Sequence, residues 1–307
     1  MAVQVNSPGM EELVDPAAQL IQVADGFLFT EGPVWNAAEQ ALYFSDIPGD
    51  ARYRWSEAGG VQVVMRPDFK ANGLVYDAQG RLIACEHVSS SVARFDRDGR
   101  REVLAFHHQG KYLNSPNDVV TRSSDGAIYF TDPGYGRMNS RMGSQRESEL
   151  GFQGVYRIPA EGGGEAELLV AEDEFDSPNG LCFSPDERIL YVDDTRRREV
   201  KAFDVAADGS LSRPRVLLGG IGSGEGARGA PDGMKCDEQG NVWVTGPGGV
   251  WVISPQGEHL GVIETPESTA NLAWGGPGWH SLFFTSSTAV HRLETKVGAA
   301  PLPYHRR

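Results

Sequence analysis

The chain has 307 residues and a formal net charge of −14 at pH 7, and 40% of its residues are hydrophobic. Such a chain can bury a substantial core, and its acidic balance argues against nucleic acid and membrane surfaces as partners. Cys85, Cys182 and Cys236 show no metal-ligand spacing, so we interpret them as reduced core residues. We expect a cytoplasmic protein, because no segment approaches the length of a membrane span.

Residues 1–16 lack the basic and apolar regions of a secretory signal. We expect them to form an N-terminal tail that is loose or packed locally. Residues 17–307 are expected to form a single domain. The domain starts with an apolar, extended segment at 18–27, which precedes the first of several repeats.

Six segments share one pattern, in which a polar residue leads into a β-strand and a short turn then leads into a second apolar run. These polar leaders are Glu31, Asn72, Asn117, Asn179, Asp232 and Asn271. They recur at intervals of about 40 to 60 residues, and such a period with several short strands per unit is typical of β-propeller blades. We therefore predict an all-β fold, a six-bladed β-propeller with four antiparallel strands per blade.

The second repeat illustrates the strands expected in one blade. Apolar runs at 73–78, 81–86, 91–96 and 101–106 are separated by turn sequences such as AQG and RDG. The sixth repeat ends without a fourth run of this kind. We expect segment 18–27 to supply the missing strand and to close the ring, which removes the open edges of the sheet.

The third repeat carries a polar insertion at 133–154, after its second strand. The second strand of a blade returns to the face from which the first strand departs. The insertion is therefore expected to hang over the mouth of the central channel, although a mobile surface loop without a role is an alternative. The Gly-rich segment 219–231 leads to Asp232 on the same face.

The six leaders should ring the mouth of the channel, because the first strand of each blade is the innermost. Carboxylates and amides gathered in one buried place need partners, and a cation would satisfy them. Oxygen ligands with two negative charges favour Ca²⁺, with Mg²⁺, Mn²⁺ or Zn²⁺ as alternatives. A polar residue before a strand is also ordinary turn chemistry, and Asn72 and Asn271 fit that interpretation.

Residues at the ends of the second strands should emerge on the same face as the leaders. These strands end at Asp46, Glu86, Asp132 and Asp194, and His87 and Tyr135 lie just beyond them. Acids and aromatic side chains suit hydrogen bonding to sugar hydroxyls. We therefore predict substrate contacts for Asn117, Glu86, His87, Asp132 and Tyr135, with solvated loop residues as the alternative. Trp35 and Trp243 are interpreted as core residues.

Four motifs in a fixed order resemble a known family. They are EGPVW from Glu31, SPND around Asn117, SPNG around Asn179 and PDGM around Asp232. In this order they resemble the senescence marker protein, gluconolactonase and luciferin-regenerating family, and its bacterial gluconolactonase branch in particular. The resemblance implies one divalent cation in the channel, with Glu31, Asn179 and Asp232 as ligands and Asn117 contacting metal or substrate.

One position departs from the family. The animal branch has a sugar-contacting Arg two residues before the match to Asn117, and this chain has Ser115 there. Substrate recognition therefore cannot be carried over from that branch.

These features predict a metal-dependent hydrolase that opens a small sugar lactone, of the glucono-1,5-lactone type, to the aldonic acid. The cation would polarise the lactone carbonyl, and a carboxylate would activate water. The resemblance favours Asp232 as this catalytic carboxylate, and Glu31 is the alternative base. Two other functions stay open: hydrolysis of another lactone or a phosphotriester at the same site, and a non-catalytic propeller that is stabilised by metal and binds a protein partner.

Overall fold

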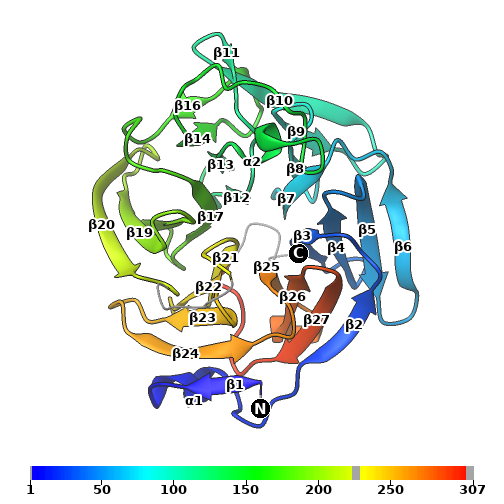
Figure 1. Ribbon diagram of the computed structural model, residues 1–307, viewed down its shortest axis with the longest axis vertical. Coiled ribbons are helices and arrows are strands. Elements are labelled where there is room, and N and C mark those ends of the chain that lie inside the picture. Colours follow the sequence, from blue (N-terminus) through cyan, green and yellow to red (C-terminus); the bar gives the residue numbers. More distant parts are fainter. Residues whose placement is uncertain (1, 223–228, 302–307) are drawn as a thin grey trace.

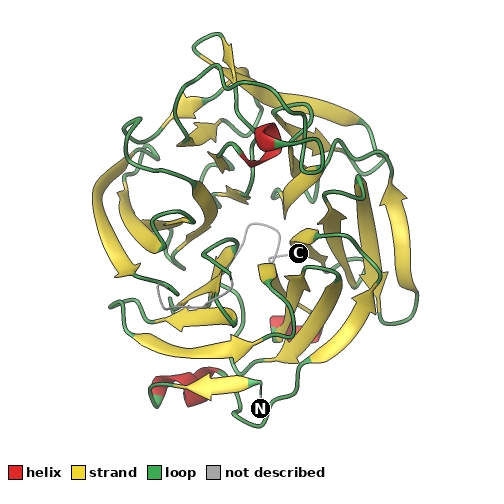
Figure 2. Cartoon of the chain, in the orientation of Figure 1, coloured by secondary structure: helices red, strands yellow, loops and turns green. Residues whose placement is uncertain are grey.

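The computed structural model describes residues 2–222 and 229–301, which form a ring of six β-sheets around a central channel (Figure 1). This arrangement confirms the predicted six-bladed β-propeller with four antiparallel strands per blade. Helices are few and short, and strands dominate the chain (Figure 2). Within the described residues, no helix is long and apolar enough to cross a membrane.

Each blade is built from strands that follow one another in sequence, from the channel outward. Blade one contains β3 (Thr30–Asn36), β4 (Ala41–Asp46), β5 (Ala51–Ser56) and β6 (Gly60–Met65). Blade two contains β7 (Ala71–Tyr76), β8 (Leu82–Glu86), β9 (Ser91–Phe95), β10 (Arg101–His108) and the short β11 (Lys111–Tyr112). Blade three contains β12 (Val119–Thr121), β13 (Ile128–Asp132), β14 (Gly154–Ile158) and β16 (Glu167–Leu168).

The remaining blades follow the same order. Blade four contains β17 (Pro178–Phe183), β18 (Ile189–Asp194), β19 (Glu199–Val205) and β20 (Leu211–Gly219). Blade five contains β21 (Met234–Cys236), β22 (Val242–Gly246), β23 (Gly249–Ile253) and β24 (His259–Glu264). Blade six contains β25 (Thr269–Gly275), β26 (Ser281–Ser286) and β27 (Ala289–Glu294), with the 3₁₀ turn η1 (Pro277–Trp279) between the first two.

The core lies between the blades, because each sheet packs both of its faces on its neighbours. Inner strands such as β8 and β17 are buried at every position, whereas the outer strand β6 is exposed along almost its whole length. The indole of Trp35 in blade one stacks on Phe283 in blade six with ring centroids 5.5 Å apart. The interpretation of Trp35 and Trp243 as core residues is confirmed, and the three cysteines are buried and unpaired, as predicted.

The N-terminal strand closes the ring. β2 (Ile21–Asp25) pairs with β27 in antiparallel register, with Ile21 opposite Arg292 and Asp25 opposite Ala289. It supplies the fourth strand of blade six, as expected from segment 18–27. A strand from one end of the chain therefore joins the sheet formed by the other end, and the two ends of the propeller are held together by backbone hydrogen bonds.

The first residues of the chain pack locally on blade five. β1 (Val3–Val5) pairs with β24, with Val3 opposite Ile263, and adds a fifth strand to that sheet. The short helix α1 (Gly9–Leu13) follows, and Met10 and Leu13 are buried in one apolar cluster with Leu260 and Ile263. Of the two expectations for this tail, the structure shows local packing. The division of the chain at residue 16 stays a prediction.

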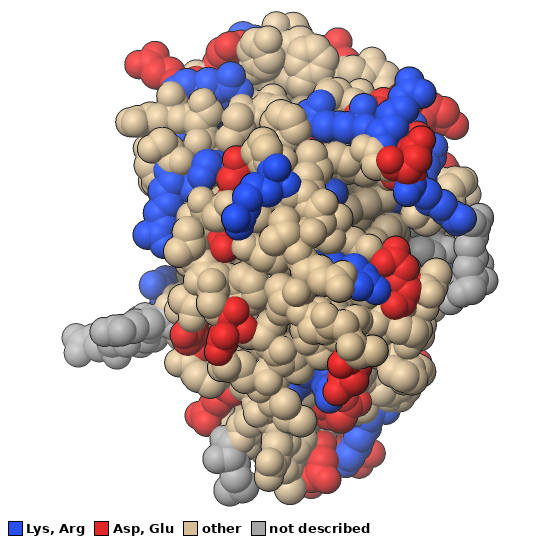
Figure 3. Space-filling model, turned by 90° about the vertical axis from the view of Figure 1, so that its right-hand side faces the viewer, with Lys and Arg blue, Asp and Glu red and all other residues tan. Residues whose placement is uncertain are grey.

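The surface carries charged side chains of both signs, and blade three departs from the regular pattern in two places. On the face of the molecule shown in Figure 3, Lys and Arg side chains are interspersed with Asp and Glu side chains among many uncharged ones. The insertion of blade three contains the short helix α2 (Tyr135–Met138). A two-residue strand, β15 (Gly164–Glu165), leaves blade three to pair in parallel with β10 of blade two.

The buried tail yields a stability prediction. The substitution Leu13→Ala should lower the free energy of unfolding by about 2–5 kcal/mol, because the buried side chain leaves a cavity in the cluster on blade five. Urea unfolding followed by circular dichroism measures this loss. Glu12→Ala in the same helix is exposed and should stay within about 0.5 kcal/mol of the parent. Equal effects of the two substitutions would show that the tail is not part of the cooperative fold.

Candidate active site

The polar leaders reach the channel because the backbone bulges where they stand. In blade one the pairing of β3 with β4 shifts register between Glu31 and Val34, and in blade four that of β17 with β18 shifts between Pro178 and Leu181. A bulge of this kind re-aims side chains relative to the alternation of a regular strand. The leaders therefore turn toward the channel while the strand after them stays in the sheet.

Glycines after the leaders let neighbouring blades approach closely. A Cβ on Gly32 would lie 1.9 Å from the carbonyl oxygen of Asn72, and one on Gly180 would lie 2.2 Å from that of Asp232. The amide of Gly180 donates to the same Asp232 oxygen at 2.8 Å. No other residue type fits such contacts. The glycine after the leader is thus part of the joint between blades as well as of a turn.

The predicted metal ligands converge in one pocket. A cavity of about 210 Å³ opens at the mouth of the channel, and Glu31, Asn117, Asn179 and Asp232 all line it. The predicted substrate contacts His87 and Tyr135 line it too. The rest of its wall is made by Phe29, Ile47, Asn72, Met138, Asn139, Met142 and Thr195.

A chain of hydrogen bonds fixes how the amides in this pocket are turned. Asn72 Nδ2 donates to Asn117 Oδ1 at 2.7 Å, and Asn117 Nδ2 donates to Asn179 Oδ1 at 2.5 Å. Asn179 Nδ2 donates to the Thr195 hydroxyl at 3.0 Å, which donates to the carbonyl of Pro231 at 2.7 Å. A carbonyl can only accept, so every donor in the chain points the same way. The amide oxygens of Asn117 and Asn179 are thereby held in place.

The two carboxylates of the pocket have raised pKa values. Burial, together with the nearby carboxylate of Asp118, raises the pKa of Glu31 to about 7. Burial and the charge of Glu31 raise the pKa of Asp232 well above its ordinary range. Glu31 Oε2 accepts hydrogen bonds from the amide of Gly32 at 2.6 Å and from Asn271 Nδ2 at 3.0 Å. Burial of two neighbouring carboxyl groups thus disfavours their ionised forms, and a cation bound between them would favour those forms.

The donor set fits a hard cation. Within residues 2–222 and 229–301, no three His, Cys, Asp or Glu side chains form a group that could hold a metal by themselves. The pocket instead combines two carboxylates with the oriented amide oxygens of Asn117 and Asn179. Such an all-oxygen set suits Ca²⁺ better than Zn²⁺, which favours imidazole and thiolate ligands.

The insertion of blade three forms one wall of the pocket. Tyr135, Met138 and Met142 all line the cavity. The loop is tied to blade two, since His87 Nδ1 lies 2.8 Å from the carbonyl of Met142 and Lys70 Nζ donates to that of Arg141 at 2.9 Å. The insertion thus lies over the mouth, as its position after a second strand predicted.

His87 is placed to act as an acceptor. It is fully buried, and burial lowers its pKa, so the imidazole is neutral near pH 7. The Met142 carbonyl can only accept, so Nδ1 carries the proton. Nε2 then lies 3.5 Å from Asn72 Nδ2, on the side of the amide chain.

The structure places Glu86 and Asp132 outside the pocket wall. Glu86 pairs with Arg101, with Oε1 accepting from Nε at 2.8 Å. Asp132 Oδ2 accepts the backbone amide of Asn114 at 2.8 Å, and burial raises the pKa of this carboxyl to about 7. Both side chains are occupied in holding the turns around them, and neither lines the cavity that holds the other predicted residues.

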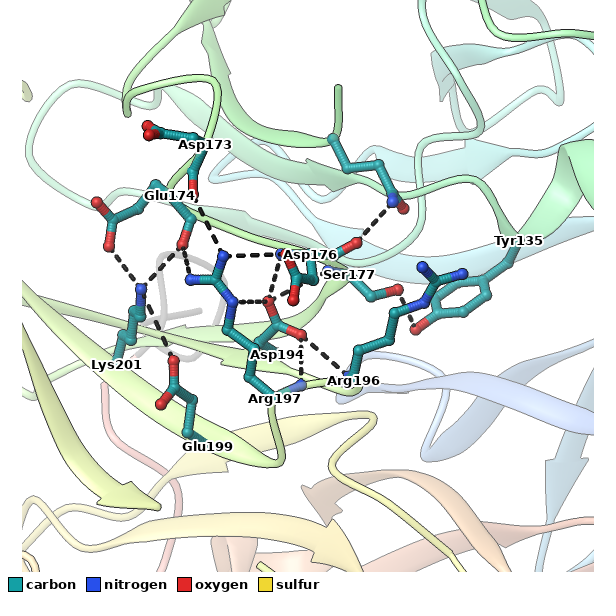
Figure 4. A network of polar contacts seen from close by, with 11 residues as sticks. Tyr135, Asp173, Glu174, Asp176, Ser177, Asp194, Arg196, Arg197, Glu199 and Lys201 are labelled. Atoms are coloured by element: carbon teal, nitrogen blue, oxygen red, sulfur yellow. Dashed lines mark hydrogen bonds and ion pairs between the residues drawn. The ribbon is translucent and has the colours of Figure 1, made fainter. Parts of the chain in front are cut away.

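Asp194, another acid at the end of a second strand, also binds backbone amides of the turns around it, and these turns reach Tyr135 of the pocket (Figure 4). Its carboxylate accepts the backbone amides of Asp176 at 2.7 Å and of Arg197 at 3.0 Å, which orders the segment before β17. Ser177 in that segment donates to the Tyr135 hydroxyl at 2.9 Å. Tyr135 of α2 is thus anchored beside Asn179.

In three of the four blades with a strand-end acid, the residue after that acid reaches the pocket. Ile47 follows Asp46, His87 follows Glu86 and Thr195 follows Asp194, and all three line the cavity. Of these three residues, His87 was predicted from the sequence, whereas Ile47 and Thr195 were not. The equivalent position in three blades was the signal that could have found them. Asp118, which is buried next to Asn117 and does not line the cavity, was also not predicted.

Known proteins resemble this chain over almost its whole length. The family described as the SMP-30/Gluconolactonase/LRE-like region matches residues 29–288. A gluconolactonase of Zymomonas mobilis is 31% identical over 311 residues, covering 95% of this chain and 85% of that protein. Pentonolactonase XacC of Haloferax volcanii is 26% identical and covers 84% of this chain and 81% of its own length.

A solved structure agrees with these sequence matches. The structure of a gluconolactonase from Xanthomonas campestris superposes with a TM-score of 0.87 at 33% identity, covering 96% of this chain and 95% of that one. The resemblance that the four motifs carry is therefore confirmed, and this chain belongs to the SMP-30/gluconolactonase/LRE-like family.

Proposed function

We propose that this protein is a lactone hydrolase that opens a small sugar lactone, of the glucono-1,5-lactone type, with the help of a divalent cation. The observation that carries the proposal is the convergence of Glu31, Asn117, Asn179 and Asp232 in one pocket at the channel mouth. Membership of a family whose relatives include a gluconolactonase and a pentonolactonase supports the substrate class.

The four side chains would hold the cation, and Ca²⁺ is the ion that their oxygen atoms suit. Ca²⁺ takes six to eight oxygen ligands, so about half of its positions would stay open to water and substrate. When bound, the cation would supply Lewis-acid polarisation of the lactone carbonyl and stabilise the oxyanion. The amide chain from Asn72 to Pro231 keeps the oxygens of Asn117 and Asn179 in a fixed orientation for this task.

Asp232 is the general base in this proposal. Its carboxylate accepts a proton from water as the water oxygen attacks the carbonyl carbon, and the proton then passes to the ring oxygen as the C–O bond breaks. Glu31 is less suited to the role, because its Oε2 already accepts two N–H donors.

His87 and Tyr135 are proposed to contact the substrate. Nε2 of His87 can accept a hydrogen bond from a hydroxyl group of the substrate, since Nδ1 donates to the Met142 carbonyl. The Tyr135 hydroxyl accepts a hydrogen bond from Ser177 and keeps its own proton for a ligand. Both side chains line the cavity beside Asn117 and Asn179, and a sugar lactone offers hydroxyl groups to each of them.

The substitution Asp232→Asn tests the base. It keeps an oxygen ligand but removes the proton acceptor, so kcat for glucono-1,5-lactone should fall by about 10²–10⁴-fold while the circular dichroism spectrum is unchanged. A pH-stat assay of acid release measures the rate. Asp98→Asn, on an exposed turn, is the matched control and should keep full activity. An Asp232→Asn variant with undiminished kcat would remove the base from the mechanism.

Removal of the cation tests the site. Chelator-treated protein should lose lactone hydrolysis and regain it with Ca²⁺, and Ca²⁺ at 100 times its dissociation constant should stabilise the fold by about 2.7 kcal/mol. Thermal melts with and without Ca²⁺ measure the second effect. Glu31→Gln should reduce this stabilisation, whereas the exposed Glu11→Gln should keep it. Full activity in protein shown by elemental analysis to be metal-free would contradict the proposal.

A further inference from the structure

Asn271 holds the carboxylate of Glu31 in one orientation. Its Nδ2 donates to Glu31 Oε2 at 3.0 Å, across the junction of blades six and one. The amide of Gly32 donates to the same oxygen at 2.6 Å. Both donors occupy Oε2, so Oε1 is the oxygen left for a cation. The sequence analysis had interpreted Asn271 as ordinary turn chemistry, and its Oδ1 does also accept the amide of Leu272 at 2.9 Å.

Lys235 acts together with the backbone amide of Leu272 to fix which way the Asn271 amide is turned. Lys235 Nζ lies 3.3 Å from Asn271 Oδ1. An ammonium group carries only donors, so it must face the amide oxygen, and Nδ2 must then face Glu31. A flipped amide would place its NH₂ group against the ammonium and against the Leu272 amide. The order of contacts is therefore Lys235 to Asn271 to Glu31.

The Lys235 side chain is itself fixed in place. It projects from β21 of blade five, is 20% exposed, and donates to the carbonyl of Met234 at 2.9 Å. Asp118 Oδ2 lies 3.8 Å from Nζ, and Asn271 Nδ2 lies 3.4 Å from the same Asp118 oxygen. The ammonium thus lies between Asn271 and Asp118, and the Lys235 side chain also lines an apolar cavity with Val34, Val75, Val120 and Trp274.

We infer that Lys235 and Asn271 are positioning residues, which together hold Glu31 in the orientation that binds the cation. The inference rests on the proposed function, since it concerns the same site. Neither residue touches the reacting atoms. Their action is on the affinity for the cation, because a carboxylate that is free to rotate must be ordered each time the ion binds.

The direction in which Ca²⁺ affinity changes when Lys235 is removed distinguishes this positioning role from a purely electrostatic one. A positive charge near the site opposes binding of a cation, so a lysine that merely balanced Asp118 would, when removed, leave tighter Ca²⁺ binding. A positioning lysine gives the opposite result. Removal should weaken binding, and outer partners of metal ligands typically change affinity by about 10–100-fold.

The experiment measures Ca²⁺ affinity by isothermal titration calorimetry on chelator-treated full-length protein, with Ca²⁺ alone as the probe. Lys235→Met should weaken binding about 10-fold, and Asn271→Leu should weaken it at least as much. The double variant should bind no more weakly than Asn271→Leu, because Lys235 acts through Asn271. Unchanged or tighter binding by Lys235→Met would overturn the inference, as would fully additive losses in the double variant.

Matched controls keep the outcomes distinct. Lys201→Met removes a buried lysine of blade four, which pairs with Glu174 at 2.6 Å, and it should leave Ca²⁺ affinity unchanged. If Lys235→Met does not fold by circular dichroism, Asn271→Leu carries the test, and affinity equal to the parent would then overturn the inference. A parent protein that binds no Ca²⁺ would overturn the proposed metal site, whereas a binding parent with unaffected variants overturns the positioning role alone.

Discussion

Close contact between the innermost strands of neighbouring blades is the constraint on which the site depends. The amides after the leaders donate across the joints, as Gly73 does to the carbonyl of Asn117 and Gly180 to that of Asp232, both at 2.8 Å. These bonds form only if the strands nearly touch, which is why glycine stands there. Because the inner strands lie this close together, the side chains of the leaders point toward one another in the channel. The fold therefore creates the polar pocket as a consequence of closing the ring.

The close approach of the inner strands also brings several acidic side chains together, and their mutual repulsion is unfavourable. Asp118 and Asp193 are buried close to Glu31 and Asp232, and burial followed by the charge of Asp232 raises the pKa of Asp193 well above its ordinary range. Lys235 brings a positive charge among these acids, with its Nζ 3.8 Å from Asp118 Oδ2. One ammonium cannot balance four carboxylates. The fold thus favours a bound cation for the same reason that it brings the leaders together.

The sequence predicted the ring and the leaders because both follow from periodicity, but it could not separate some neighbouring positions. Glu86 and His87 are adjacent, and only the structure shows that Glu86 turns to Arg101 while His87 turns to the pocket. Asp118 was not predicted because the strand bulges there: the backbones of Asn117 and Asp118 both pair with Thr131. Such a bulge breaks the alternation of side chains on which the prediction relied. Asn271 was undervalued because its turn bond to Leu272 is real and its bond to Glu31 spans the ring closure.

Ser115 stands where the animal branch has an Arg, and in this structure it holds the insertion of blade three in place. Its hydroxyl donates to the carbonyl of Pro133 at 2.6 Å and accepts the amide of Gly136 at 2.9 Å, so it fastens the insertion of blade three. A Cβ on Gly136 would lie 2.6 Å from that of His87, which shows how tightly the loop packs there. A long side chain at position 115 would displace this loop, and with it Tyr135. In this chain the loop therefore contributes one wall of the pocket, while hydrogen bonds between the blades hold the leaders that form the rest of it.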